Sequence, residues 1–284
     1  MQLVVTAGKG GTGKTTVATA LALSLQERYP VQFLDCDVEE PDAHILLKPE
    51  IKEREPVYIK RPAVDEERCD YCGRCAKMCE FNAIVVIKGK MVLVYDELCH
   101  GCGLCRLVCP REAISEHDEE IGLIERGIAQ GIKYLQGTLK VGEPLATPII
   151  RRLKEKIDPE KVAILDSAPG TGCPVIETMH GADFVILVTE PTPFGLHDLR
   201  LTVGVAKTLG LRIGVVINRD GVSDRSVEAY CEEEGLPILM RIPLDRRIAV
   251  AYSQGIPLVE AFPQWKEQFI RLYERIGLIH GVPI

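Results

Sequence analysis

The stretch VVTAGKGGTGKTTVATALALSL, residues 4–25, decides how the beginning of this chain folds. Its glycines and second lysine fit the spacing G-x-x-x-x-G-K-T, which is typical of loops that bind phosphate groups. Residues 2–7 before the loop are apolar and β-branched, and residues 14–28 after it show helical apolar spacing. A strand, a glycine loop and a helix therefore follow one another in the order that a phosphate site requires. The alternative is an ordinary glycine-rich turn between a strand and a helix.

The residues of this loop have distinct expected roles. Loop amides and the helix N-terminus would face the phosphates of a nucleotide. Lys14 is expected to contact the β- and γ-phosphates, and Thr15 to hold Mg²⁺. A nucleotide site needs only one lysine in this loop, so the role of the other lysine, Lys9, is not explained by the nucleotide of the same chain. The loop part of the predicted nucleotide site consists of Gly8, Lys9, Gly10, Gly11, Thr12, Gly13, Lys14, Thr15 and Thr16.

Apolar segments along the rest of the chain predict further parallel strands. They alternate with segments of helical spacing, and this alternation predicts an α/β fold with a doubly wound, mostly parallel sheet. The predicted strands lie at 31–37, 161–170, 183–190, 212–218 and 236–243, and the predicted helices near 194–209, 223–235 and 263–277. Residues 119–146 resemble short strands that return the chain to the sheet.

Two of these strands end in acidic residues, VQFLDCD (31–37) and KVAILDSAPG (161–170). Ligands of open α/β sheets bind at the carboxyl ends of the strands, so both acidic groups fall where a nucleotide would bind. Asp166 is expected to support Mg²⁺ through its water shell, and the alternative is a helix-capping or turn aspartate. Gly170 is a candidate to contact the γ-phosphate through its backbone.

Composition excludes several classes of protein. The chain has 284 residues, of which 46% are hydrophobic, enough for one large domain with a small insert. A net charge of −7 argues against a nucleic-acid-binding protein. No apolar run reaches the roughly 18 residues of a membrane span, and the first segment lacks the basic flank of a signal peptide. We therefore expect a cytoplasmic protein without stable membrane association, in which clustered cysteines indicate metal rather than disulfides.

Eight of the eleven cysteines lie in two similar segments, residues 65–84 and 95–114, at an offset of 30 residues. Each segment contains C-x₂-C-x₂-C-x₃-C, the pattern of bacterial ferredoxins with two [4Fe–4S] clusters, in which the fourth cysteine serves the other cluster. The first segment departs from the pattern by having Glu80 where proline usually follows. Zinc is the alternative. The predicted ligand sets are Cys69, Cys72, Cys75 and Cys109 for one cluster, and Cys99, Cys102, Cys105 and Cys79 for the other.

The run Lys9-Gly10-Gly11-Thr12-Gly13-Lys14-Thr15-Thr16 resembles the deviant Walker A motif of the MinD/ParA group of ATPases. This group includes the nitrogenase iron protein and the Mrp-type cluster carriers. The resemblance implies that Lys9 crosses a dimer interface to the partner's ATP, so that ATP binding produces a homodimer; a solvated lysine is the alternative. It also implies that Asp37 orients the attacking water and contributes to the Mg²⁺ site. Asp42 is a candidate sensor of Mg²⁺ or phosphate, with the nearby Asp35, Glu39 and Glu40 as alternatives.

The same resemblance implies an adenine-binding role for Asn218 and for the loop of Pro243, Leu244 and Asp245. Turn residues are the alternative at these positions. Residues 61–118 resemble the ferredoxin domain that is inserted in one branch of the MinD superfamily. The predicted domains are an ATPase domain of residues 1–60 and 119–284 and a ferredoxin-type insert of residues 61–118.

Three cysteines lie outside the insert. Cys36 and Cys231 are interpreted as packing residues. Cys173 follows Asp166 by seven residues, at a spacing that resembles the cluster-ligating cysteine of the nitrogenase iron protein. That relative supplies a second cysteine per subunit, which residues 174–230 here do not contain. Cys173 is therefore a candidate for a transient bridging ligand in a dimer, and a small packing residue is the alternative.

Three functions follow from these features. The first is an ATP-dependent factor that assembles or transfers iron–sulfur or heterometal cofactors to a client metalloprotein. The second is an ATP-gated electron donor that serves a redox partner. The third is a MinD-like positioning ATPase that binds a membrane. The third needs a membrane-binding helix, but the apolar stripe of the last predicted helix is interpreted as core: Trp265, Phe269, Leu272, Tyr273 and Ile276.

Overall fold

A computed structural model describes residues 1–221 and 225–280 of the chain. Within these residues, nine strands form one sheet in the order β11-β10-β9-β1-β8-β2-β7-β6-β3. Strands from β11 to β7 pair in parallel, and β6 and β3 are antiparallel. The predicted mostly parallel α/β sheet is confirmed. The strands are β1 (Gln2–Thr6), β2 (Val31–Cys36), β3 (Glu50–Val64), β6 (Ile114–Ala129), β7 (Ile132–Leu139), β8 (Val162–Ser167), β9 (Phe184–Thr189), β10 (Ile213–Asp220) and β11 (Ile238–Pro243).

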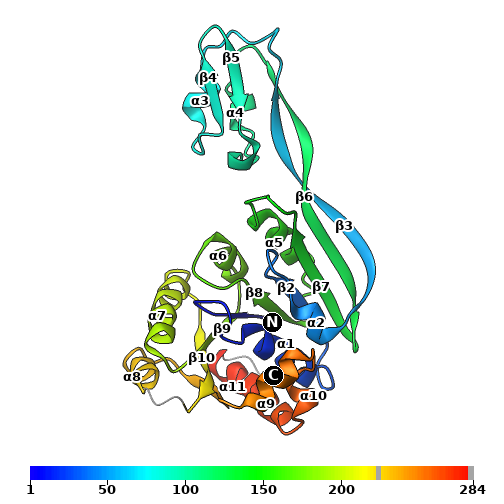
Figure 1. Ribbon diagram of the computed structural model, residues 1–284, viewed down its shortest axis with the longest axis vertical. Coiled ribbons are helices and arrows are strands. Elements are labelled where there is room, and N and C mark those ends of the chain that lie inside the picture. The colour runs from blue at the N-terminus through cyan, green and yellow to red at the C-terminus, as the bar shows by residue number, and fades with distance from the viewer. Residues whose placement is uncertain (222–224, 281–284) are drawn as a thin grey trace.

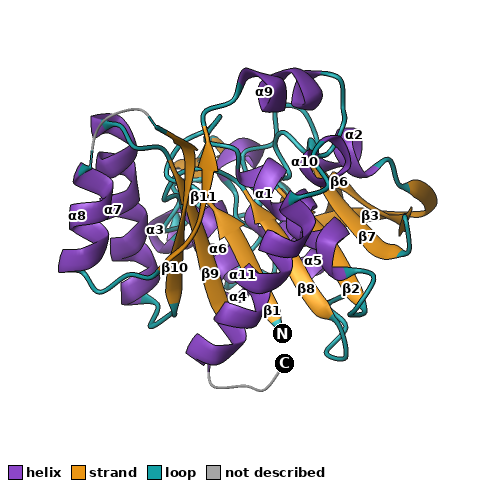
Figure 2. Ribbon diagram, turned by 90° about the horizontal axis from the view of Figure 1, so that it is seen from below, coloured by secondary structure: helices purple, strands orange, loops and turns teal. Residues whose placement is uncertain are grey.

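Helices cover both faces of the sheet (Figure 2). The predicted helices near 14–28, 194–209 and 263–277 are confirmed, with ends that shift by a few residues. Residues 223 and 224 of the predicted helix 223–235 lie outside the described residues, and α8 begins at Ser226. The helices of this body are α1 (Lys14–Leu25), α2 (Ala43–Leu47), α5 (Thr147–Lys154), α6 (Cys173–Met179), α7 (Pro193–Thr208), α8 (Ser226–Glu233), α9 (Arg246–Ser253), α10 (Leu258–Ala261) and α11 (Trp265–His280).

Alternating side chains of the central strands pack into two separate hydrophobic cores, one on each face of the sheet. In β1, Leu3 and Val5 join the core under α1 and α11, while Val4 joins the core under α5 and α7. Successive side chains of a strand point to opposite faces, so a strand covered on both sides is apolar throughout. The stripe of α11 is buried, with Phe269 and Ile276 fully covered. Its interpretation as core is confirmed.

A long ribbon carries the cysteine-rich segment away from the sheet (Figure 1). Strands β3 and β6 pair antiparallel from Glu50 opposite Ile128 to Val64 opposite Ile114. Beyond the ribbon lies a small unit with a two-stranded sheet. The proposed domain boundaries, after residues 60 and 118, fall inside the ribbon rather than at its ends. The elements of this unit are α3 (Arg74–Met78), β4 (Ile84–Ile87), β5 (Met91–Val94), the 3₁₀ turn Asp96–Leu98 and α4 (Leu104–Leu107).

Candidate functional site

The glycine loop joins β1 to α1 and lies against two neighbouring elements. Gly13 has a φ of 92°, a left-handed conformation that glycine adopts without steric cost. A Cβ atom at Gly13 would lie 2.3 Å from the Asn218 amide nitrogen, and one at Gly8 would lie 2.5 Å from the Asp198 side chain. Glycine is therefore required at both positions by close packing.

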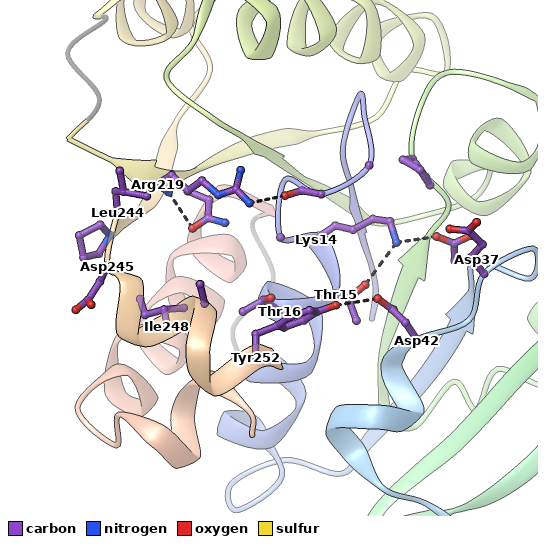
Figure 3. Close-up of a pocket in the computed structure, with 18 residues that line it drawn as sticks. Lys14, Thr15, Thr16, Asp37, Asp42, Arg219, Leu244, Asp245, Ile248 and Tyr252 are labelled. Atoms are coloured by element: carbon purple, nitrogen blue, oxygen red, sulfur yellow. Dashed lines mark hydrogen bonds and ion pairs between the residues drawn. The ribbon is translucent and has the colours of Figure 1, made fainter. Parts of the chain in front are cut away.

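The loop borders a cavity of about 380 Å³ at the carboxyl end of the sheet (Figure 3). This is the position at which open α/β sheets bind ligands. Most of the predicted nucleotide residues line it, together with residues of α9 that the sequence did not indicate. Among the lining residues are Gly10, Gly11, Gly13, Lys14, Thr15, Thr16, Asp37, Glu40, Asp42, Asn218, Arg219, Pro243, Leu244, Asp245, Ile248 and Tyr252.

Lys14 points toward the acidic side of this cavity (Figure 3). Its Nζ lies 2.9 Å from an Asp37 carboxylate oxygen and 3.7 Å from one of Asp166. Burial alone would lower the pKa of Lys14, but attraction to Asp166 and Asp37 outweighs burial and raises the pKa above its ordinary value. Lys14 is therefore charged at neutral pH and available to a phosphate group.

Asp166, at the end of β8, is a fully buried carboxyl group. Neither of its oxygens has a hydrogen-bond partner among the described residues. Burial raises its pKa, against the attraction of Lys14. A buried carboxylate that accepts no hydrogen bond from the described part of the chain, beside the Thr15 side chain, suits a hard cation, because Mg²⁺ prefers oxygen ligands. The predicted Mg²⁺ residues Thr15, Asp37 and Asp166 thus fit such an ion.

Asp35 lies next to Asp166 in the sheet register but has another role. Its carboxylate accepts hydrogen bonds from the backbone amides of Asp37, at 3.2 Å, and Ala43, at 3.1 Å. It therefore holds the segment between β2 and α2, in which Asp42 reaches the cavity.

Tyr252 and Arg219 are two cavity residues that sequence reasoning missed. The Tyr252 hydroxyl, from α9, donates a hydrogen bond of 3.0 Å to the Asp42 carboxylate (Figure 3). Burial, and then the charge of Asp42, raise the pKa of Tyr252 to about 12. Arg219 donates to Glu190, at 2.6 Å, and to the Gly11 carbonyl, at 3.0 Å. These contacts join residues far apart in the chain, so no local pattern indicates them.

Lys9 lies outside the cavity lining and faces a different partner from Lys14. Its Nζ is 3.7 Å from the carboxylate of the buried Glu190, and 36% of its side chain is exposed. Four other predicted residues, Gly8, Thr12, Asp166 and Gly170, also do not line the cavity. The Thr12 carbonyl accepts a 2.7 Å hydrogen bond from Asn218, and the Gly170 amide donates to Ala7 at 2.8 Å.

The eight cysteines of the distal unit gather in two sets. One cavity is lined by Cys69, Cys72, Cys75 and Cys109, and a second by Cys79, Cys99, Cys102 and Cys105. Each set contains three closely spaced cysteines and one from the other segment. These are the two ligand sets that the sequence pattern predicts.

Backbone amides donate to the sulfur atoms in the same way in both halves. The amides of Tyr71 and Gly101 lie 3.4 Å from the sulfurs of Cys69 and Cys99. Those of Ala83 and Ala113 lie 3.3 Å from Cys79 and Cys109. Such hydrogen bonds are typical around iron–sulfur ligands, whose charge they stabilise. In the described residues, no three Cys, His, Asp or Glu side chains converge closely enough to hold a single metal ion.

The remaining cysteines differ in exposure. Cys36 and Cys231 are buried, which confirms their interpretation as packing residues, whereas Cys173 is exposed at the start of α6. None of the helices in residues 1–221 and 225–280 has the length and apolarity needed to cross a membrane.

The parallel sheet, the glycine loop, the cavity lined by Lys14 and the buried Asp166 next to Lys14 define a P-loop nucleotide-binding protein. The chain belongs to the CobQ/CobB/MinD/ParA nucleotide-binding domain family, whose model matches residues 3–258. The expected membership of the MinD/ParA group is thereby confirmed.

Individual relatives span nearly the whole chain. It is 32% identical to the uncharacterized protein MJ0579 of Methanocaldococcus jannaschii over 260 residues, 90% of each chain. It is 26% identical to an iron–sulfur cluster carrier protein of Pyrococcus abyssi, over 91% of this chain and 79% of that one. Its fold resembles that of the septum site-determining protein MinD of Pyrococcus horikoshii in complex with Mg-ADP. That comparison gives a TM-score of 0.60 and 22% identity, over 99% of this chain and 97% of that one.

Proposed function

We propose that the chain is an ATP-hydrolysing iron–sulfur protein that assembles or transfers iron–sulfur or heterometal cofactors to a client metalloprotein. One observation carries this proposal: a single chain combines the Lys14 cavity with two separate four-cysteine cavities. The similarity to a relative named as an iron–sulfur cluster carrier supports it. In this proposal, residues 61–118 form the ferredoxin-type insert and residues 1–60 and 119–284 the ATPase domain.

The cavity supports specific roles for its residues in hydrolysis. Lys14 would leave Asp37 to bind the β- and γ-phosphates, because a phosphate group competes for the same ammonium group. Asp37, freed from Lys14, would accept a hydrogen bond from the attacking water. Thr15 and Asp166 would hold Mg²⁺, which when bound neutralises the charge that develops on the phosphates. Asn218 and the loop of Pro243, which line the cavity, would contact the base.

Lys9 would act in a homodimer that ATP produces. In a single chain it pairs with Glu190, and its partly exposed side chain is free to exchange this partner for a phosphate group of the facing subunit. Dimerisation would then complete both nucleotide sites at once, because a two-fold interface repeats each contact.

Each cysteine set would hold one [4Fe–4S] cluster, which when bound stores a single electron. Exposed Cys173 is the candidate for a transient ligand of transferred metal. The second candidate function is an ATP-gated electron donor to a redox partner. The mirrored amide–sulfur hydrogen bonds in both halves favour it, because they suit two resident clusters of similar stability.

The proposed function is tested by an anaerobic pull-down of clients in ATP and in ADP, followed by measurement of the metal content of each captured protein. An assembly factor binds an apo-protein and leaves it with more iron or heterometal. An electron donor binds a metalloprotein whose metal content stays constant and whose oxidation state changes.

A further inference from the structure

Arg61 is a buried arginine at the base of the distal unit. It lies in β3, and only 1% of its surface is exposed. One guanidinium nitrogen donates to the Cys99 carbonyl, and the other donates to both carboxylate oxygens of Glu143, at 3.1 and 2.9 Å. A buried charge requires a partner, so Glu143 fixes Arg61 and Arg61 fixes the backbone at Cys99.

Glu143 belongs to the segment that follows β7. The Glu143 amide donates to the Lys140 carbonyl at 3.0 Å, and the neighbouring Leu139 amide donates to the Val38 carbonyl at 2.7 Å. Val38 follows Asp37, whose carboxylate binds Lys14 at 2.9 Å. Hydrogen bonds and short pieces of backbone therefore connect Lys14 to the Cys99 loop without interruption.

Nucleotide binding would act on the first contact of this connection. A ligand shifts a conformational equilibrium only when it interacts differently with the two states. A γ-phosphate competes with Asp37 for the Lys14 ammonium group, so Asp37 and the adjoining Val38 exchange Lys14 for a different partner when ATP binds with Mg²⁺.

The two cysteine loops are attached differently to the ribbon. A Cβ atom at Gly101 would lie 2.9 Å from the Lys60 carbonyl oxygen, so the Cys99 loop packs directly on β3 beside Arg61. The equivalent position in the other half is Tyr71, a non-glycine residue with a φ of 54°. The ion pair beside that loop, between Arg111 and Asp70 at 3.1 Å, lies within the distal unit.

From this asymmetry we infer that Arg61 is a positioning residue that couples ATP binding to one cysteine cavity, the one lined by Cys79, Cys99, Cys102 and Cys105. The cavity lined by Cys69, Cys72, Cys75 and Cys109 does not respond to ATP binding. This inference rests on the proposed function in one respect: it assumes that the cavity lined by Lys14 binds ATP and that each cysteine cavity holds a cluster.

The test uses the full-length, cluster-loaded protein under anaerobic conditions, with amide hydrogen exchange measured with and without Mg²⁺ and a non-hydrolysable ATP analogue. In the wild type, exchange at residues 99–105 changes by at least about fivefold, the lower end of usual allosteric couplings. Exchange at residues 69–75 changes by less than about twofold, below that range. Equal responses in the two loops would overturn the inference.

Two variants break the contacts by which Arg61 joins Glu143 to the Cys99 carbonyl, one at each residue of the ion pair. Glu143→Gln removes the partner of the guanidinium group, and Arg61→Lys keeps the buried charge but lacks the forked geometry that reaches both partners. In both, the response at 99–105 is lost while affinity for the analogue is retained. Arg54→Gln is the matched control, because Arg54 lies on the same strand as Arg61, is exposed, and pairs with Glu125 of β6 at 2.8 Å. It keeps the wild-type response.

A wild-type response in Arg61→Lys would show that the bridge does not carry the coupling, even if Glu143→Gln does not fold. The proposed function fails separately. If the protein shows the selective response at residues 99–105 but transfers no metal to its client, the coupling through Arg61 stands and the proposed role in metal transfer fails.

Discussion

At the scale of single residues, the two loop lysines are distinguished by their partners. Lys14 is buried among Asp37 and Asp166, whereas Lys9 is partly exposed and shares Glu190 with Arg219. Glu190 is itself buried, so it offers a stable partner to Lys9 in the single chain. A facing subunit must supply a stronger partner if Lys9 is to cross an interface, and a nucleotide phosphate with its greater charge meets this condition.

We predict that Lys9→Ala abolishes ATP-dependent dimerisation and hydrolysis while nucleotide affinity falls less than about tenfold, or 1.4 kcal/mol. Affinity is retained because Lys14 and the loop amides remain. Sedimentation in ATP and in ADP, together with a nucleotide-binding titration, measures both effects. Lys207→Ala, on the outer surface of α7, is the control. Hydrolysis at the wild-type rate in Lys9→Ala would exclude the shared site.

The second residue-scale prediction concerns the pH dependence of stability through Asp166. Burial, opposed by Lys14, raises its pKa from the ordinary range of a carboxyl group to about 6. A raised pKa stabilises the fold below the unfolded pKa, and this contribution is lost as the pH rises through the folded pKa. Asp166→Asn cannot ionise, so we expect its stability relative to the wild type to increase by about 1–3 kcal/mol between acidic and neutral pH.

The measurement is urea unfolding of nucleotide-free protein at a series of pH values from about 3.5 to about 7.5, which includes both the unfolded and the folded pKa of Asp166. The single tryptophan, Trp265, is buried in the core under α11 and reports on the nucleotide-binding body. Parallel pH profiles of Asp166→Asn and wild type would contradict the prediction. The same variant should lose Mg²⁺-dependent hydrolysis.

Cys173 separates the two candidate functions. It is exposed at the start of α6, a few residues after the Asp166 strand. We predict that Cys173→Ser keeps both clusters and most ATPase activity but loses metal or cluster transfer to the client. Reduction of a redox partner should be unaffected, because the eight other cysteines remain. Normal transfer by this variant would show that the exposed Cys173 holds no transferred metal, and it would favour the electron donor.

At the scale of elements, α9 and α2 are joined across the nucleotide cavity by the Tyr252–Asp42 hydrogen bond. We predict that Tyr252→Phe lets ADP both enter and leave about two- to tenfold faster, because a hydrogen bond of about 0.5–1.5 kcal/mol no longer joins the two sides. Stopped-flow measurement with a fluorescent ADP analogue checks this. Tyr58→Phe, on exposed β3, should leave both rates unchanged. Unaltered rates in Tyr252→Phe would show that this contact does not control entry.

At the scale of the whole molecule, the two cysteine sets predict the metal content. We expect anaerobically prepared protein to contain about eight irons and about eight acid-labile sulfides per chain, with a ferredoxin-like EPR signal on reduction. Replacing Cys102 by Ser should remove about half of the iron, because Cys102 lines only one cavity. Stoichiometric zinc in place of iron would contradict the cluster assignment.

Much of this protein was predictable from its sequence because the decisive signals are local. The spacing of Gly8, Gly13 and Lys14 fixes a loop between a strand and a helix, and six apolar segments match β1, β2, β8, β9, β10 and β11. Buried parallel strands are apolar on both faces, so they need no partner to be found. The cysteine spacing predicted how eight thiols divide into the two sets that line the two cavities.

Only the tertiary structure decided the rest, because the remaining features depend on residues distant in the chain. The β3–β6 ribbon is rich in charge and exposed at many positions, so it has no continuous apolar pattern. Its two strands pair although the whole distal unit separates them in the sequence. The Tyr252–Asp42 and Lys9–Glu190 contacts each join opposite parts of the fold. Arg61 is an ordinary charged residue in sequence, and it becomes a buried bridge only because the fold brings Cys99 and Glu143 to the same place.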